Sequence, residues 1–338
     1  MTPIPYQHKM AAHCETGTVS GLLNYNGLPL TEPMVFGIAS GIFFGYMKMK
    51  SFNFPAFFVR TRPGDIRKKI SKRLGIDFYV KSFKKPEEAQ RELDQLLEKN
   101  IPVVVKVDFF YMNYLAPWMR VHNNAHFITV IGKENSNYYV SDCYHSEVAE
   151  LDAETMSKAR FAGGMESPKG FMYYPVRIPK EIDYERNIIT GIRKAAYNML
   201  KIPIPFLGIK GIRLFSEKVT GWPKLARDME HLSHEIMRIN VLLEDQGTGG
   251  GGFRFMYATF LRQASEMLGN EKLLEFSKRM MQIGNDWRSV SVCAIRMNKD
   301  KDFSEERFKE LSALIGNCAV AEKAFFTDIY QFAKHYGK

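Results

Sequence analysis

The spacing of hydrophobic positions changes character once along the chain, close to Pro179. Before that point, short β-branched and aromatic runs of strand length alternate with helical segments. Beyond it, apolar residues recur at helical spacing over long segments, without a recognisable strand. We therefore expect an α+β domain over residues 1–178 and an all-α domain over residues 179–338.

In the first part, the pattern places helices ahead of most strands. One helix is expected to begin at Cys14, and others at residues 32–48, 65–74 and 86–99. Strands are expected at residues 52–59, 78–82, 102–107, 126–131, 138–141 and 170–177. In the second part, helices are expected at residues 182–201, 222–243, 253–268, 271–295 and 304–332.

Cys14 directly follows His13 and stands at the start of the first expected helix. Unpaired N–H groups at a helix N-terminus carry partial positive charge, which favours the nucleophilic thiolate over the thiol. A free cysteine also commonly fills a core as a small hydrophobic residue. Cys14 is therefore a candidate nucleophile whose role depends on the residues that the fold brings to it.

A hairpin expected over residues 126–141 supplies partners for that cysteine. Its first strand opens with His126, and Asp142 follows its return strand, so both side chains are expected at the same end of the sheet. A thiol, an imidazole and a carboxylate are the nucleophile, base and orienting group of a catalytic triad. The alternative is a core cysteine, a strand histidine and a turn aspartate that share nothing. Their chain order and expected positions favour the triad.

The sequence also resembles a known family over nearly its whole length. In the first half, the resemblance rests on residues 13–17 (His-Cys-Glu-Thr-Gly), residues 27–41 (Gly-Leu-Pro-Leu-Thr-Glu-Pro-Met-Val-Phe-Gly-Ile-Ala-Ser-Gly), Val107-Asp108, Tyr114-Leu115 and the hairpin that ends at Asp142. These segments are similar to the N-terminal domain family named after butirosin biosynthesis protein H. Residues 208–212 (Gly-Ile-Lys-Gly-Ile) and 249–261 (Gly-Gly-Gly-Gly-Phe-Arg-Phe-Met-Tyr-Ala-Thr-Phe-Leu) are similar to the helical domain of unknown function that often follows it.

This resemblance implies a papain-like, C39-peptidase-like fold that is used for acyl transfer. The family's namesake moves an aminoacyl group from an acyl carrier protein thioester to an amine of an aminoglycoside. Cys14, His126 and Asp142 match the triad positions of the family. The resemblance therefore implies an acyl carrier protein as partner and its phosphopantetheine thioester as the substrate arm, with no bound cofactor.

The oxyanion hole departs from the papain-like pattern. Papain-like enzymes usually carry a glutamine six residues before the cysteine, whereas Gln7 lies seven residues before Cys14. Gln7 is a candidate for this role, and His8, His13 or backbone N–H groups are the alternatives.

Composition limits the class of protein. With 338 residues, 45% hydrophobic and 25% charged, the chain is expected to be globular, not disordered or fibrous. It shows no secretion signal and no apolar stretch long enough to span a membrane, so we expect a cytoplasmic protein. The four cysteines lack CxxC or metal-ligand spacing, which favours reduced thiols and no metal site.

The net charge of +10 points to an acidic partner. Its densest stretch contains five candidate docking residues for an acyl carrier protein, namely Arg60, Arg62, Arg67, Lys68 and Lys69. Nucleic acid is a poorer fit, because no nucleic-acid-binding motif or interleaved aromatic residue accompanies the stretch. A solvated helix face without a partner is the alternative to docking.

Three further features bear on the site. Glu32 opens an expected helix, where capping is the favoured role and recognition of a substrate amine the alternative. Tyr111 belongs to an aromatic run before His126 and is a candidate for holding the acyl chain. His122 lies four residues before His126, but the intervening asparagines favour a loop, so we expect no metal pair. The glycines at 249–252 are either a flexible hinge or a loop over the site.

The sequence therefore predicts a cysteine-dependent acyltransferase that acts on a carrier-bound thioester and a small-molecule amine or hydroxyl acceptor. A papain-like cysteine peptidase or amidase is the main alternative, because it uses the same triad on an amide. A binding protein with a degenerate triad is a third interpretation. Neither the acyl group, the acceptor nor the oligomeric state follows from these residues.

Overall fold

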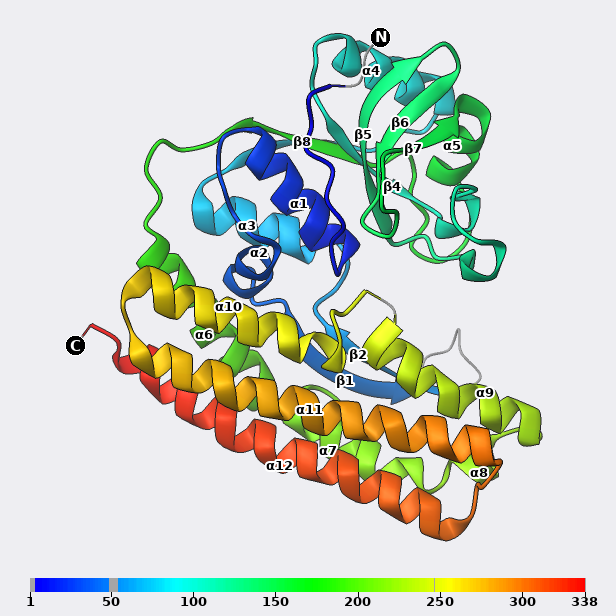
Figure 1. Cartoon of the computed structure of the whole chain (residues 1–338), viewed down its shortest axis with the longest axis vertical. Coiled ribbons are helices and arrows are strands. Elements are labelled where there is room, and N and C mark those ends of the chain that lie inside the picture. Colours follow the sequence, from blue (N-terminus) through cyan, green and yellow to red (C-terminus); the bar gives the residue numbers. More distant parts are fainter. Residues whose placement is uncertain (1–3, 49–53, 246, 338) are drawn as a thin grey trace. The chain divides into compact units, whose positions relative to one another are not determined.

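The computed structural model describes residues 4–48, 54–245 and 247–337 (Figure 1). The chain divides into two compact units. The first comprises the chain up to Val35 together with Ile66–Ile182, and the second comprises Phe36–Asp65 and the chain from Asp183 onward. The second break lies close to the boundary expected after residue 178. Phe36–Asp65 differs from expectation, because it belongs with the helical unit.

A six-stranded antiparallel sheet organises the first unit, in the order β3-β8-β4-β5-β6-β7 (Figure 1). Its strands are β3 (Asp77–Lys81), β4 (Val103–Val107), β5 (His126–Glu134), β6 (Asn137–Ser141), β7 (Ala149–Asp152) and β8 (Met172–Arg177). The sheet follows helix α1, so this unit has the α+β order that the sequence predicted. β5 and β6 form the expected hairpin.

Helices cover both faces of this sheet. They are α1 (Cys14–Tyr25), α3 (Asp65–Leu74), α4 (Pro86–Glu98) and α5 (Ala153–Arg160), with short 3₁₀ turns η1 (Phe109–Tyr111) and η2 (Pro117–Met119). Successive strand residues point to opposite faces. Val103, Val105 and Val107 accordingly join the core shared with α4 and α5, whereas Tyr173 of β8 contacts Thr18 of α1 on the other face. Helix α1 is thus held against the sheet from its first turns.

The second unit is mainly helical and adds a two-stranded antiparallel sheet of β1 (Ile42–Lys48) and β2 (Pro55–Arg60). Helix α2 (Glu32–Ile38) leads from the first unit into it. Its further elements are α6 (Tyr184–Lys201), α7 (Gly208–Val219), α8 (Trp222–Leu225), α9 (Met229–Asn240), π-helical η3 (Val241–Asp245), 3₁₀-helical η4 (Gly251–Phe253), α10 (Arg254–Leu268), α11 (Glu271–Asp300) and α12 (Glu305–His335).

The helix expected over residues 32–48 is wrong. Helix α2 ends at Ile38, Ser40 has a positive φ of 53°, and strand β1 begins at Ile42. The residues of this run are almost all buried, so periodicity could not separate helix from strand. The aromatic side chains of β1 favour the strand over a helix, because Phe44 stacks on Phe57 and Trp287.

Other expected bounds also shift. The helix expected at 222–243 is two helices, since Ala226, which follows α8, is extended. Helices α5 and α7 and strand β7 were not predicted. Part of the strand expected at residues 52–59 lies outside the described residues, and the described part forms β2.

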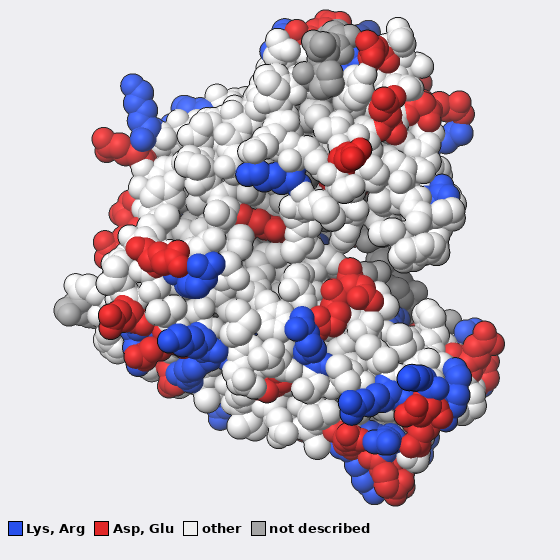
Figure 2. All heavy atoms as spheres, viewed as in Figure 1, with Lys and Arg blue, Asp and Glu red and all other residues white. Residues whose placement is uncertain are grey.

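Charged side chains of both signs are interspersed over the helices of the second unit on the face that Figure 2 shows. Ion pairs occur on the helices of this unit, for example between Lys309 and Glu305 and between Arg279 and Asp328. That face of the unit therefore carries no single basic patch. Among residues 4–48, 54–245 and 247–337, no helix is both long and apolar enough to cross a membrane.

Candidate active site

Helix α1 begins at Cys14, as the sequence predicted. The residue before it, His13, is the N-cap, and its Nδ1 accepts a hydrogen bond from the backbone N–H of Thr16 at 3.3 Å. Cys14 is 7% exposed and lies among the unpaired N–H groups of the first turn. The thiol therefore lies at the positive end of the helix dipole.

His126 and Asp142 meet at one end of the β5–β6 hairpin. His126 shares its side of β5 with Ile128 and Val130, and Asp142 continues the row of Tyr138 and Val140 on the paired strand. The period of two thus brings both side chains to the same face. His126 Nε2 lies 2.8 Å from Asp142 Oδ2, and both residues are buried.

Two further groups hold the Asp142 carboxylate. The hydroxyl of Tyr114 donates to Oδ2 at 2.7 Å, and the backbone N–H of Tyr144 donates to Oδ1 at 3.0 Å. Burial raises the pKa of Asp142, but the charge and hydrogen bond of His126 outweigh it, and the pKa is lowered. Asp142 is therefore held as a carboxylate that orients the imidazole.

The thiol of Cys14 lies close to this pair. Its Sγ is 3.8 Å from the carbonyl oxygen of Ala125, the residue before His126. Burial lowers the pKa of His126, but Asp142 and then Cys14 outweigh it and raise it to about 10. Because Nε2 faces Asp142, Nδ1 is the ring nitrogen that can exchange a proton with the thiol. The three residues that the sequence singled out are thus brought together.

Glu32 anchors the loop that precedes Cys14. Its carboxylate accepts hydrogen bonds from the backbone N–H groups of Ala12 and His13 and from the hydroxyl of Thr16, at 2.7 to 3.0 Å. Burial outweighs these bonds and raises the pKa of Glu32. These contacts fix the backbone around the thiol, which is neither of the two roles expected for Glu32, capping of its own helix and recognition of a substrate amine.

Glu15 and Arg67 join α1 to α3. The buried carboxylate of Glu15 accepts from the backbone N–H of Ile66 and of Arg67, at the N-terminus of α3. The guanidinium of Arg67 is buried over the rings of Phe78, Phe171 and Tyr173. The docking role that we expected for Arg67 is therefore wrong, because its charge lies inside the first unit.

The remaining candidate docking residues lie on both sides of the division into units. Arg60 and Arg62 belong to the second unit, and Lys68 and Lys69 to the first. Arg62 and Lys68 are exposed, and Arg60 and Lys69 are half-buried. Arg60 donates to the carbonyl of Thr61. An exposed basic face on α3 therefore consists of Lys68 and Lys72, and it is smaller than the sequence suggested.

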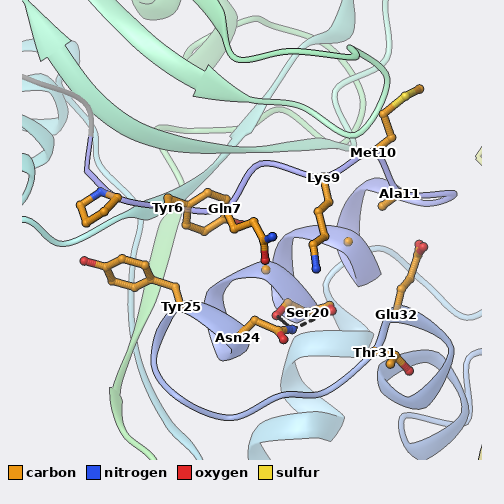
Figure 3. A pocket seen from close by; sticks show the side chains of 13 residues that line it. Tyr6, Gln7, Lys9, Met10, Ala11, Ser20, Asn24, Tyr25, Thr31 and Glu32 are labelled. Carbon is orange, nitrogen blue, oxygen red and sulfur yellow. Dashed lines mark hydrogen bonds between the residues drawn. The ribbon is translucent and has the colours of Figure 1, made fainter.

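Gln7 and His8 occupy the segment before the cysteine loop. Gln7 is exposed and lines a cavity beside α1 (Figure 3). The ring nitrogens of His8, six residues before Cys14, lie 2.8 Å from Ser141 Oγ and 3.1 Å from the carbonyl oxygen of His145. His8 thereby ties this segment to the end of β6, next to Asp142.

Aromatic rings surround His126, but Tyr111 is not the one that contacts it. The ring of Phe109 meets the imidazole edge-on, with 4.8 Å between the ring centroids. The ring of Tyr144 stacks on the imidazole, with 5.7 Å between the centroids. Tyr111 packs against the core and lies 6.3 Å from the ring of His122. The aromatic run was therefore a useful signal, and the contact residue in it is Phe109.

Within the described residues, no group of three or more His, Cys, Asp or Glu side chains forms a metal-binding cluster. His122 bonds Asp108 through Nδ1 at 2.7 Å and stacks on Phe110. All four cysteines are buried and unbridged. Cys143, adjacent to Asp142, has a pKa raised well above the usual value by burial and by the charge of Asp142.

The glycine segment belongs to the second unit and makes hydrogen bonds within it. Gly251 donates its N–H to Glu244 Oε1, and the carbonyl of Gly252 accepts from Arg254. Gly249, Gly250, Gly251 and Gly252 all have positive φ values between 55° and 85°. These bonds attach the segment to its own unit, and both interpretations, the hinge and the loop over the site, stay predictions.

Tyr114 is the main site residue that our reading of the chemistry missed. It contributed only to the family resemblance. A tyrosine that donates to a catalytic carboxylate has no fixed spacing from it, and here the loop from η1 to β5 makes the contact.

Two family models match the chain. The one described as "Butirosin biosynthesis protein H, N-terminal" matches residues 13–143, and the one described as "Domain of unknown function (DUF4872)" matches residues 154–329. Among solved structures, a C39-like peptidase from Bacillus anthracis is 13% identical, with a TM-score of 0.34, and the match covers 52% of this chain and 96% of that chain. No curated protein matches. The first family match includes Cys14, His126 and Asp142.

Proposed function

Because the chain belongs to the DUF4872 family and its first part to the butirosin biosynthesis protein H N-terminal family, we propose that it is a cysteine-dependent acyltransferase. The observation that carries the proposal is the buried His126–Asp142 pair beside the thiol at the start of α1. The acyl donor is a thioester on the phosphopantetheine arm of an acyl carrier protein, and the acceptor is an amine or a hydroxyl.

The first step forms an acyl-enzyme. The Cys14 thiolate attacks the thioester carbonyl, a new bond forms between Sγ and the acyl carbon, and the bond to the pantetheine sulfur breaks. His126, as imidazolium, gives its Nδ1 proton to the departing sulfur. The raised pKa of His126 supports this step, because it keeps the imidazolium populated beside the thiolate.

The second step releases the product. Neutral His126 takes the proton of the acceptor while its nitrogen or oxygen attacks the acyl carbon, and Cys14 leaves as a thiolate. Asp142 holds the imidazole through Nε2 in both steps and stabilises the imidazolium. One thioester replaces another in the first step, so orientation of the acceptor and stabilisation of the oxyanion supply most of the rate enhancement.

Intact mass spectrometry tests the nucleophile directly. Wild type and Cys14→Ala are incubated with a panel of acyl-carrier-protein and pantetheine thioesters. We expect an increase of one acyl mass on wild type alone, and its loss when an amine or alcohol acceptor is added. Failure of every thioester to acylate a protein whose Cys14 still reacts with iodoacetamide would overturn the proposal.

Carrier docking is tested by charge reversal on the exposed face of α3. We expect Lys68→Glu with Lys72→Glu to slow acylation from the carrier-bound thioester and leave acylation from free pantetheine thioester unchanged. Lys84→Glu with Lys85→Glu, two exposed lysines before α4, is the matched control. Equal rates from the carrier in both double variants would exclude this face as the docking surface.

A cysteine peptidase or amidase is the second candidate, since the same thiol and imidazole attack an amide. The two differ in the second step. Turnover of peptides with water as the acceptor, without acylation by any thioester, favours the peptidase.

A further inference from the structure

A cavity of about 550 Å³ lies in the first unit, between the segment that precedes Cys14 and helix α1 (Figure 3). Its floor is one face of α1, formed by Gly17, Ser20, Gly21 and Asn24. At 1.5 Å per residue, this face extends for about 10 Å along the helix. The volume suits a small organic molecule.

One end of the cavity borders the loop that precedes Cys14, and Cys14 itself is not among the residues that line it. Ala11, Gly17 and Glu32 line one end, and Gly17 is one helical turn beyond Cys14. A Cβ at Gly17 would lie 2.5 Å from Cβ of Ala11, so the glycine lets the preceding segment lie against the helix. Farther along α1, away from Cys14, the cavity is lined by Ser20, Gly21, Asn24 and Tyr25.

The two charged side chains that line the cavity differ in whether they are free to bind a ligand. Among the described residues that line it, Glu32 alone is acidic, and both of its carboxylate oxygens already accept hydrogen bonds from the cysteine loop and Thr16. Lys9 is the basic residue among the described lining residues; it is exposed and extends from the opposite wall toward α1 in Figure 3. Within the part of the chain that the structure describes, Lys9 has no ion-pair or hydrogen-bond partner. The charge left to meet a ligand is therefore positive.

Neutral polar groups complete the wall. Gln7 extends into the cavity beside Lys9, and Asn24 lies across from it (Figure 3). The amide of Asn24 is fixed by its Nδ2, which donates to the carbonyls of Ser20 and Leu30. A polycationic ligand would find no free carboxylate among these residues, whereas an anionic group would find the ammonium of Lys9 and the amide N–H groups of Gln7.

We propose that this cavity binds the acyl acceptor and that the acceptor carries an anionic group, a carboxylate or a phosphate, which pairs with Lys9. The proposal rests on the acyl-transfer function and names the class of acceptor. The anionic group lies against Lys9 and Gln7, and the amine or hydroxyl of the acceptor extends toward the end of the cavity near Cys14.

Equilibrium binding tests the cavity without any chemistry. Ligand-observed NMR on Cys14→Ala compares the proteinogenic L-amino acids with their amides, phosphoethanolamine with ethanolamine, and spermidine as the polycation. We expect at least one anionic member to bind about tenfold more tightly than its neutral counterpart, a difference of about 1.4 kcal/mol. The amino acids and phosphoethanolamine distinguish a carboxylate from a phosphate.

Charge reversal assigns the binding to the cavity. In the Cys14→Ala background, Lys9→Glu is expected to abolish the preference for the anion, and Lys84→Glu, with the same change at an exposed lysine outside the cavity, to retain it. In the active enzyme, Lys9→Glu is expected to raise the KM of that acceptor about tenfold.

Three results would overturn the inference: no member of the panel binds, the neutral or cationic members bind as well as the anions, or Lys84→Glu weakens binding as much as Lys9→Glu. Its failure is separable from failure of the acyl-transfer proposal. Loss of anion binding with intact acylation of Cys14 disproves the acceptor site alone. Anion binding without acylation disproves acyl transfer and, with it, the role of the ligand as acceptor.

Discussion

A buried pair of opposite charges lies in each unit, and the two pairs have different surroundings. In the first unit, His126 faces Asp142 at 2.8 Å, and in the second, Arg254 Nε donates to Glu322 Oε1 at the same distance. All four side chains are almost completely inaccessible. Burial and pairing alone therefore do not distinguish a reactive site from a structural one.

The neighbours make the distinction. Arg254 also donates to the carbonyl of Gly252, and Glu322 accepts from the indole N–H of Trp287 at 2.6 Å, so these bonds fix backbone and core. His126 instead has a thiol beside it, and that thiol helps to raise its pKa. The first pair therefore lies beside a thiol with which it can exchange a proton, whereas the second bonds to the glycine segment before α10.

The largest expected effect separates the two pairs by activity. Asp142→Asn preserves the size of the side chain but removes the charge that stabilises the imidazolium, and we expect acylation of Cys14 to slow by about 10³ to 10⁴. Single-turnover acylation measures this rate. Glu322→Gln is the matched control in the other unit. A comparable loss of acylation rate per folded molecule in this variant would show that the two pairs do not differ in their effect on activity.

The free energy of unfolding is expected to depend strongly on the Arg254–Glu322 pair. Glu322→Ala leaves the Arg254 guanidinium buried without its carboxylate, and we expect it to lower the free energy of unfolding by about 3 to 5 kcal/mol. Denaturant titration measures the change. Arg254→Met combined with Glu322→Leu is expected to recover much of the loss, because it removes both charges. A double variant as unstable as the single one would show that contacts other than the ion pair dominate.

The pH dependence of stability tests the His126–Asp142 pair. The pKa of His126 is raised from 6.5 to about 10, so its contribution is full below about 6.5 and disappears as the pH rises through 10. The lowered pKa of Asp142 removes the contribution as the pH falls below 3.8. The difference in unfolding free energy between wild type and Asp142→Asn is therefore expected to be largest between pH 4 and 6.5. A difference that stays constant up to pH 10 would contradict the ion pair.

The elements around this pair could be predicted because local signals were strong. Cys14 stands where α1 begins, and the β-branched run of β5 with a polar turn defined the hairpin that joins His126 to Asp142. Strand β1 could not be predicted, because its apolar residues are buried on both faces and so show no alternation. Its partner, β2, follows later in the chain, after residues 49–53.

The positions of charged side chains depended on tertiary structure. Arg67 belongs to a basic run, yet it is buried because aromatic rings from β3 and β8 cover it. Glu15, adjacent to Cys14, gave no sign that it would bind the N-terminus of α3. Such contacts link residues far apart in the sequence, and local spacing carries no information on them.

The smallest expected effect concerns Tyr114, which donates to the same oxygen of Asp142 that faces His126. Tyr114→Phe removes this competing donor, so the pKa of Asp142 rises and the carboxylate interacts more strongly with the imidazolium. We expect the upper limb of the pH profile of Cys14 alkylation to move to higher pH, with a loss of stability of about 1 kcal/mol. Tyr111→Phe, in the same aromatic run but without contact to Asp142, is the control. A purely structural role for Tyr114 predicts the same stability loss with an unshifted profile, so the pH profile, not the stability, decides whether Tyr114 tunes the pair.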